Sequence, residues 1–215
     1  MTRIALLSDT HAYWDERYAK YFAECDEIWH AGDIGSLELA NRLQDIRPLK
    51  AVHGNIDGGE LRRIYPETLT WQCEEAKIMM THIGGYPGKY DPRIRKQLYA
   101  TMPDLFISGH SHILKVQYDP TLSCLHINPG AAGLQGWQTV RTLVRFTIDG
   151  KQFKDLEVIE LYADPKTLPL TPPQGRGVVT TYLCPHQRNI ILPPLVGGYG
   201  EGSPLTRINH DWHHS

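Results

Sequence analysis

The sequence predicts an α/β domain that contains two β-sheets. Between residues 4 and 55, short apolar runs alternate with segments of helical pattern, and this alternation is typical of βαβ units with parallel strands. From residue 68 onward, apolar runs follow one another across tight turns, which indicates antiparallel pairs. We therefore expect strands that are more parallel early in the chain and more antiparallel late.

The early part of the chain carries strand and helix signals in alternation. Ser36 is a suitable N-cap for a segment whose apolar residues have helical spacing, and Pro48 ends that segment. Short continuous apolar runs that stop at polar residues are typical of strands buried on both faces. We predict strands at residues 4–7, 27–29 and 50–52, and helices at residues 14–24 and 37–43.

The later part of the chain carries mainly strand signals. Asp149 and Gly150 separate two runs of alternating polarity, and Asp-Gly in that position predicts a hairpin. Pro92 suits the first turn of a helix, because its missing N–H needs no partner there. We predict one helix at residues 91–101 and strands at residues 68–73, 77–81, 104–108, 115–118, 123–127, 139–148 and 153–161.

The composition changes after residue 162. Eight of the fifteen prolines lie in residues 163–215, together with a glycine-rich run at residues 197–202. Proline and glycine at this density disfavour a packed core. We expect one domain over residues 1–162 and a tail over residues 163–215 that is poorly ordered, or draped over the domain or over a neighbouring subunit in a homodimer.

The composition of the whole chain is that of an ordinary globular protein. Of the 215 residues, 41% are hydrophobic and 21% are charged. The net charge of −2 gives no basis for nonspecific binding to nucleic acids or membranes. The four cysteines form no CxxC pair, which favours free thiols in a reducing cytosol. With no leader pattern and no apolar stretch near the ~18 residues of a membrane span, we expect a cytoplasmic protein.

Five short polar clusters, each at the end of an apolar run, carry most of the functional information. Alone, each cluster is typical of a turn or a helix cap. Together they offer two Asp, one Asn and four His, which are the side chains expected around two metal ions. The clusters are Asp9-Thr10-His11, Gly32-Asp33, Gly54-Asn55, His82 and Gly109-His110-Ser111-His112.

The residue types within these clusters suit metal coordination. Asp9 and His11 are two residues apart, so that their side chains lie on the same side of an extended turn, and the Gly-His-Ser-His run repeats that spacing. Asp33 has two carboxylate oxygens with which to bridge two cations. Asn55 adds a neutral carbonyl oxygen, and His82 completes the set.

The predicted ligands also indicate which metals the site prefers. Oxygen and nitrogen ligands without thiolate suit Mn²⁺, Fe²⁺, Co²⁺, Ni²⁺ or Zn²⁺. Two such ions about 3.5–4 Å apart share a hydroxide and hold a phosphoryl group for in-line attack. We therefore predict two divalent cations, with Mn²⁺ the first to test, and a small phosphate ester as substrate.

Other polar residues are given structural interpretations. His30 and His126 lie within strand patterns and are expected in the core. His53 is expected to pack against the sheets and to point away from the predicted site. Asn128, within Asn-Pro-Gly, is expected to shape a loop near the site. Arg93 and the basic residues that follow it fit a solvated helix face.

With these motifs the chain resembles the calcineurin-like metallophosphoesterases, and in particular the small prokaryotic phosphodiesterases of that superfamily. The family pattern of D-x-H, G-D, G-N, a lone H and G-H-x-H is present in full, within a resemblance that covers residues 4–162. It implies a two-sheet β-sandwich flanked by helices on both faces, in four layers. It also implies two metal ions, one held by Asp9, His11, Asp33 and His112 and the other by Asp33, Asn55, His82 and His110.

The chain departs from the wider family at one position. Many members place a histidine directly after the asparagine, where it contacts the phosphate and protonates the leaving group. Ile56 occupies that position here, and the small phosphodiesterases commonly lack the histidine too. Because loss of a general acid slows a reaction by about 10²–10⁴-fold, we expect slow turnover that favours acidic leaving groups.

The resemblance implies a phosphodiesterase in which Asp33, Asn55 and His82 act through the metal ions and a bridging hydroxide. One alternative is a non-catalytic interaction scaffold on the same fold, for which the retromer subunit of this superfamily is a precedent. Another alternative is a nucleotide or dinucleoside-polyphosphate hydrolase. A nuclease is disfavoured, because the sequence lacks the basic and aromatic pattern of a nucleic-acid groove.

Overall fold

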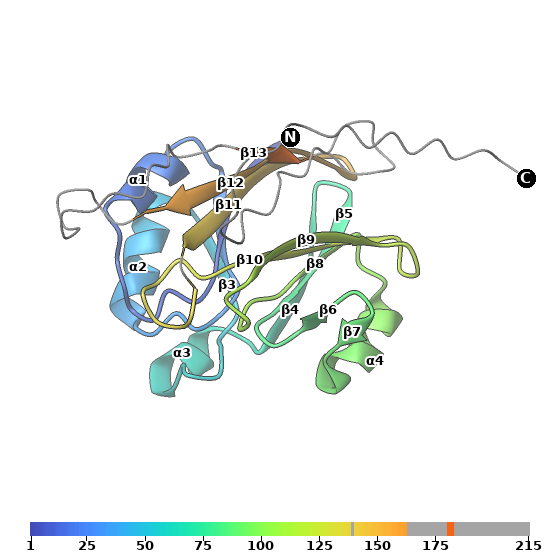
Figure 1. The fold of residues 1–215 in the computed structure, drawn as a ribbon, viewed down its shortest axis with the longest axis horizontal. Helices are drawn as coiled ribbons and strands as arrows, with labels where there is room; N and C mark the ends of the chain where they lie inside the picture. Colours follow the sequence, from blue (N-terminus) through green and yellow to red (C-terminus); the bar gives the residue numbers. More distant parts are fainter. Residues whose placement is uncertain (139, 163–179, 183–215) are drawn as a thin grey trace, which may run out of the picture.

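Two β-sheets pack face to face, with helices outside both of them (Figure 1). The computed structural model describes residues 1–138 and 140–162, together with the backbone of residues 180–182. The helices are α1 (Arg17–Phe22), α2 (Leu37–Ile46), α3 (Gly59–Ile64) and α4 (Pro92–Thr101). The strands are β1 (Thr2–Leu7), β2 (Glu27–His30), β3 (Leu49–Ala51), β4 (Thr68–Cys73), β5 (Ala76–Thr81), β6 (Gly85–Tyr86), β7 (Lys89–Tyr90), β8 (Leu105–Ile107), β9 (Leu114–Asp119), β10 (Cys124–Pro129), β11 (Arg141–Asp149), β12 (Gln152–Leu161) and β13 (Thr180–Tyr182).

Each large sheet contains both parallel and antiparallel pairs. The first sheet has the strand order β13-β12-β11-β1-β2-β3, and the second has the order β4-β5-β8-β10-β9. In the first sheet, β1, β2 and β3 are parallel. In the second sheet, β5, β8 and β10 are parallel. The remaining strands, β4, β9, β11, β12 and β13, pair antiparallel with their neighbours, as predicted for the later part of the chain.

The main core lies between the two sheets. Alternate residues of one strand point to opposite faces, so Ile4 and Leu6 of β1 face the second sheet, while Ala5 and Leu7 face the helices. Trp29 is fully buried in this inner core and meets Trp71 of the second sheet edge-on, with ring centroids 4.8 Å apart. This double burial explains why the strands read as continuous apolar runs.

Helices cover the outer faces of both sheets. Tyr18 and Phe22 of α1 and Leu43 of α2 are buried against the first sheet. Ile94 and Leu98 of α4 are buried against the second. The order of helix, sheet, sheet and helix confirms the four-layer sandwich implied by the resemblance (Figure 1).

The helices differ in detail from the sequence-based expectation. Ser36 caps α2 as predicted, since its side chain accepts a hydrogen bond from the Leu39 N–H at 3.2 Å. The helix predicted over residues 14–24 is shorter, because the Asp15 side chain accepts a hydrogen bond from the Arg17 N–H and ends the preceding turn there. The short helix α3 was not predicted, because it begins at Gly59 and glycine disfavours helix.

Two further strand features were not predicted from sequence. The glycine-rich segment between His82 and α4 forms the small hairpin β6–β7. In the predicted tail, Thr180–Tyr182 pairs antiparallel with β12 as the edge strand β13. The remainder of residues 163–215 lies outside the described residues. Among the helices that the structure describes, none is both long and apolar enough to cross a membrane.

His126 is buried in β10, as predicted, and makes stability depend on pH. Its side chain is 1% exposed, and burial lowers its pKa to about 3. The unfolded chain takes up this proton near pH 6.5, so stability is complete above that pH and falls as the pH drops toward 3. We expect a loss of about 2 kcal/mol between pH 7 and pH 5 from this group. Urea unfolding at both pH values should show a smaller difference for His126→Gln, and an unchanged difference would contradict the prediction.

Candidate metal centre

The seven predicted ligands lie just beyond the carboxyl ends of parallel strands in both sheets. Asp9, Asp33 and Asn55 follow β1, β2 and β3 of the first sheet, and His82 follows β5 of the second. His110 and its neighbour two residues on follow β8. Loops at the carboxyl ends of parallel strands gather along one edge of a sheet, and the packing of the two sheets brings both edges together.

The histidines and aspartates form two groups of three. The ligand atoms within each group all lie within 4.8 Å of one another. Asn55 adjoins the second group, since its Oδ1 lies 3.1 Å from Nε2 of His82. The groups are Asp9, His11 and His112, and Asp33, His82 and His110.

Asp33 lies between the two groups. Its Oδ2 is 3.2 Å from Nε2 of His82 in the second group and 3.8 Å from Nε2 of His11 in the first. Its Oδ1 accepts a hydrogen bond from the Ile56 N–H at 3.0 Å. Burial would raise the pKa of this carboxyl, but the hydrogen bond and charge of His82 outweigh it and hold the pKa below its ordinary value. Asp33 is therefore a carboxylate that contacts both groups.

His82 points its Nε2 at two oxygen acceptors. Its Nδ1–H donates to the Ala31 carbonyl at 2.8 Å, which leaves Nε2 facing Asp33 and Asn55. The two oxygens need either a proton on Nε2 or a cation that the three atoms share. Burial lowers the pKa of His82, but the contact with Asp33 and the charge of Asp9 raise it more. The same electrostatic field attracts a cation.

Asp9 gives a second indication that the donors fit a cation. Its Oδ2 accepts hydrogen bonds from Ser8 Oγ at 2.6 Å and from the His110 N–H at 3.1 Å. Its Oδ1 is buried and has no hydrogen-bond donor among the described residues. It faces Nε2 of His112 at 3.1 Å, and His112 Nδ1 lies 3.0 Å from Gln138 Oε1. A buried carboxylate oxygen without a donor is costly unless a cation neutralises it, so these residues fit a metal ion.

Five of the seven predicted ligands have backbone conformations that are rare for residues other than glycine. Their φ angles all lie between 48° and 67°, in the left-handed region, where each residue stores strain of about 1–3 kcal/mol. Packing must hold these residues in place, and such strain is concentrated at functional sites. They are Asp9, His11, Asp33, His110 and His112.

Glycines let the ligand loops approach one another closely. Gly32 has a φ of +91°, and a Cβ on it would lie 2.7 Å from the ring of His82. A Cβ on Gly54 would lie 2.0 Å from Oδ1 of Asp33. Any larger residue at either position would push a predicted ligand out of place, which explains the Gly-Asp and Gly-Asn pairs.

Asn128 positions the Gly-His-Ser-His loop, as predicted for a structural residue. Its Nδ2 donates to the Gly109 carbonyl at 2.8 Å and to Ser111 Oγ at 3.1 Å. Its Oδ1 accepts from the Gly130 N–H at 3.0 Å. The amide thereby fixes the loop that carries two of the predicted ligands.

Asp57 supports the site but was not singled out by the sequence analysis. Its carboxylate accepts three backbone hydrogen bonds, from the N–H groups of Ile34 (3.0 Å), Gly35 (2.7 Å) and Gly54 (2.8 Å). It therefore ties the loop of Asp33 to the loop of Asn55. The one sequence signal for Asp57 is that it is an acidic residue two positions after the predicted ligand Asn55.

Replacing Asp57 with alanine should weaken metal binding without removing a ligand. Three backbone N–H groups would lose their acceptor, and the two loops would shift relative to each other. We expect metal affinity to fall by about 10–100-fold, the usual effect of losing a residue that orients ligands. Calorimetric titration with Mn²⁺ measures this effect. Asp45→Ala, at an exposed position of α2, is the control, and equal affinities in both variants would refute the role.

Ile56, the residue at which the chain departs from the family pattern, and the nearby His53 differ in exposure. Ile56 is 49% exposed, and its side chain offers no group that transfers a proton. His53 is half-buried and lines a hollow together with Asn55 and His82. The expectation that His53 points away from the site is therefore wrong, because its N–H donates to the Pro66 carbonyl at 3.0 Å and so ties the loop after β3 to the segment that precedes β4.

Comparison with known proteins agrees with this geometry. The model of the calcineurin-like phosphoesterase superfamily domain matches residues 2–151. The chain belongs to the calcineurin-like phosphoesterase superfamily. A protein of Methanothermobacter thermautotrophicus described as a probable metallophosphoesterase is 27% identical to this phosphoesterase over 167 residues, which are 73% of this chain and 91% of the relative.

Solved structures show the same phosphoesterase fold at lower sequence identity. Vps29 of Chaetomium thermophilum matches with a TM-score of 0.62 and 15% identity, over 75% of this chain and 92% of that one. Vps29 of Entamoeba histolytica, solved in complex with Zn²⁺, matches with a TM-score of 0.57 and 17% identity, over 74% and 91% of the two chains. At these identities the likeness concerns the fold alone.

Proposed function

We propose that this phosphoesterase is a two-metal phosphodiesterase that hydrolyses a small phosphate ester. The observation that carries the proposal is the position of Asp33, whose carboxylate contacts both groups of ligands. A bridging carboxylate places two cations close enough to act on one phosphoryl group. Asp9 Oδ1 supports the same interpretation, because it is buried without a hydrogen bond and a cation shared with His112 Nε2 would neutralise it.

The residues of the chain would bind and orient the reacting groups. Two divalent cations, when bound, would lower the pKa of a water molecule and neutralise charge on the phosphate. Asp9, His11 and His112 would hold one cation, while His82, His110 and Asn55 would hold the other, with Asp33 shared. Asn55 is exposed at the rim, so it lies where substrate arrives.

The donor set favours a transition metal over an alkaline-earth ion. Four imidazoles with carboxylate and amide oxygens suit Mn²⁺, Fe²⁺, Co²⁺, Ni²⁺ or Zn²⁺. We propose Mn²⁺ as the working metal, with Zn²⁺ as the principal rival because the Vps29 of Entamoeba histolytica was solved with Zn²⁺.

The experiment that tests the proposal is metal-dependent hydrolysis. Protein stripped of metal with a chelator is assayed with bis-p-nitrophenyl phosphate and p-nitrophenyl phosphate after separate addition of Mn²⁺, Ni²⁺, Zn²⁺ and Mg²⁺. We expect restored diesterase activity that exceeds monoesterase activity. Metal binding without hydrolysis of either ester would reject the proposal.

The rate of this reaction should depend more strongly than usual on the acidity of the leaving group. Ile56 supplies no proton at the position where many relatives carry a histidine. We expect the rate to fall steeply as the leaving alcohol becomes less acidic across a series of aryl diesters. A flat dependence would indicate that another side chain donates the proton.

A scaffold function is the second candidate, and the Vps29 structures favour it because they share this fold. Hydrolysis separates the two functions. A scaffold would bind a protein partner equally well after His110→Ala, whereas the phosphodiesterase would lose activity with that change. The clustering of four imidazoles around two carboxylates favours the enzyme, since protein binding does not require it.

A further inference from the structure

A hollow of about 460 Å³ opens directly beside the second group of ligands. Asn55 and His82 form part of its wall, so the hollow is continuous with the candidate metal centre. Its size lies within the range of small-molecule sites. The other lining residues are His53, Gly54, Arg62, Glu67, Thr68, Thr81, Ile83, Arg93, Ile94 and Gln97.

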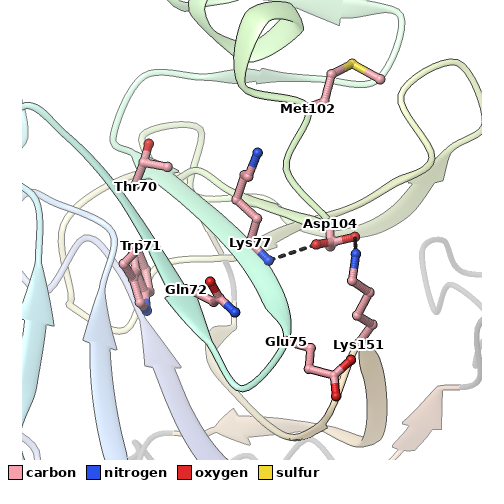
Figure 2. A pocket seen from close by; sticks show the side chains of 8 residues that line it. All are labelled: Thr70, Trp71, Gln72, Glu75, Lys77, Met102, Asp104 and Lys151. Atoms are coloured by element: carbon pink, nitrogen blue, oxygen red, sulfur yellow. Dashed lines mark hydrogen bonds and ion pairs between the residues drawn. The ribbon is translucent and has the colours of Figure 1, made fainter.

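A second hollow, of about 340 Å³, serves as a contrast (Figure 2). Lys77, at the start of β5, lines it, whereas His82 follows the end of that strand. A six-residue strand spans about 20 Å, so this hollow is remote from the ligands. In Figure 2 the amine of Lys151 meets Asp104, an ion pair of 3.6 Å. None of the seven predicted ligands lines this hollow.

The lining of the hollow beside the ligands carries a net positive charge. Arg62 and Arg93 are its two cationic side chains, and Glu67 is its one acidic side chain, which leaves a net formal charge of +1 with His53 neutral. Most of its remaining lining is polar, with two threonines and a glutamine against two isoleucines. Such a lining suits a polar group with hydrogen-bond acceptors better than an apolar one.

The two arginines are not equally available to a ligand. Arg62 donates through Nε and Nη2 to the carbonyls of Asp57, Gly54 and Asn55, so its guanidinium holds the turn that carries Asn55. Arg93 donates Nε and Nη2 to Asp91, at 2.9 Å and 3.0 Å. Its Nη1 has no hydrogen bond among the residues that the structure describes, and its side chain is 66% exposed.

We propose that this hollow binds one ester arm of the substrate and that Arg93 recognises an anionic group, such as a carboxylate or a second phosphate, on that arm. The inference rests on the proposed phosphodiesterase function, because the phosphoryl group would sit at Asn55 and His82. A diester has two arms beyond its phosphorus, and this hollow adjoins the ligands on one side. Arg93 is fixed by Asp91 and so offers its free nitrogen in a defined direction.

Two matched diesters test the proposal. p-Nitrophenyl 2-carboxyethyl phosphate and p-nitrophenyl 2-carbamoylethyl phosphate have the same shape and the same leaving group, and they differ by one negative charge. For the metal-loaded full-length protein we expect kcat/KM to be about tenfold higher for the carboxylate, the effect of one charge-assisted hydrogen bond.

Arg93→Gln should reduce this ratio of about ten to nearly one. Arg95→Gln, on the same helix but outside the lining of the hollow, removes the same charge and should keep the ratio. The comparison therefore separates contact with the arm from a general loss of positive charge. A ratio near one in the wild type, or an Arg93→Gln variant that keeps the preference, would overturn the proposal.

Failure of the proposed function gives a different result from failure of this inference. If no variant hydrolyses either diester with any metal, the phosphodiesterase function fails. The hollow is then tested by calorimetry with the two monoesters, 2-carboxyethyl phosphate and 2-carbamoylethyl phosphate, on the metal-loaded protein. Tighter binding of the carboxylate that Arg93→Gln abolishes would support the subsite. Equal binding of the two monoesters would reject it.

Discussion

Replacing Asp33 with asparagine is expected to remove tight metal binding and hydrolysis together. The amide keeps the shape of the side chain and can still accept the hydrogen bond from the Ile56 N–H. It loses the negative charge between His11 and His82. We expect metal affinity to fall by more than about 100-fold, because an orienting residue alone contributes 10–100-fold, and diesterase activity to fall with it. Metal analysis after dialysis and the diester assay measure the two effects.

Asp155→Asn is the matched control for this prediction. Asp155 also has a positive φ, of 51°, but it is exposed on β12. The same chemical change at the same kind of backbone conformation should leave metal content and activity unaltered. If Asp33→Asn retained both metals and full activity, the assignment of Asp33 as the shared carboxylate would be wrong.

Replacing Asp15 with alanine is expected to cause a large loss of stability. Asp15 is 6% exposed and accepts hydrogen bonds from Arg141 Nη2 at 2.7 Å and Arg17 Nη2 at 2.6 Å. Burial raises the pKa of its carboxyl, but these arginines lower it more, so the pKa lies well below its ordinary range. Alanine would leave the buried Arg141 without this carboxylate. Breaking a buried pair costs about 3–5 kcal/mol, and on the order of 10 °C in Tm for a chain of this length.

Two variants control for this effect. Asp149→Asn disrupts the ion pair with Lys154, in which both side chains are at least 40% exposed, and it should cost at most about 1 kcal/mol. The double change of Asp15→Leu with Arg141→Met removes both buried charges and should recover part of the loss. Differential scanning calorimetry compares them. A single Asp15→Ala variant as stable as Asp149→Asn would show that the pair contributes little.

The pair of Asp15 and Arg141 also supports the candidate metal centre. Arg141 Nη1 donates to the Ala132 carbonyl at 3.0 Å, and the Ala132 N–H donates to the Ser8 carbonyl at 2.9 Å. Ser8 immediately precedes Asp9, so a network of hydrogen bonds links the buried pair to a predicted ligand. Loss of Asp15 should therefore lower metal affinity as well as stability.

Much of the fold could be predicted because its signals are local. Ser36 identifies the start of α2, and Asp149-Gly150 identifies the hairpin between β11 and β12, as the structure confirms. The hairpin β6–β7 and the helix α3 were not predicted, because each is only a few residues long and begins at glycine. Contacts with the rest of the domain, not local propensity, stabilise such short elements.

The seven predicted ligands could be named for a similar reason. Each follows an apolar run, and the run indicates a strand whose end delivers the side chain. The position of His53 was misjudged, because sequence does not show the path of a loop, whereas Arg93 is exposed on a helix face as expected. The hollow that these two residues share depends on how α4 and the loop after β3 meet.

The sequence by itself determined the class of fold and the types of side chain at the strand ends, since strand periodicity and polar clusters are encoded within a few residues. Only the tertiary structure placed Asn55, His82 and Arg93 around one hollow beside the ligands. It also paired Asp15 with Arg141 across 126 positions of the chain. These contacts depend on how the two sheets pack. Packing brings together residues that are far apart along the chain, and no local sequence pattern links such residues.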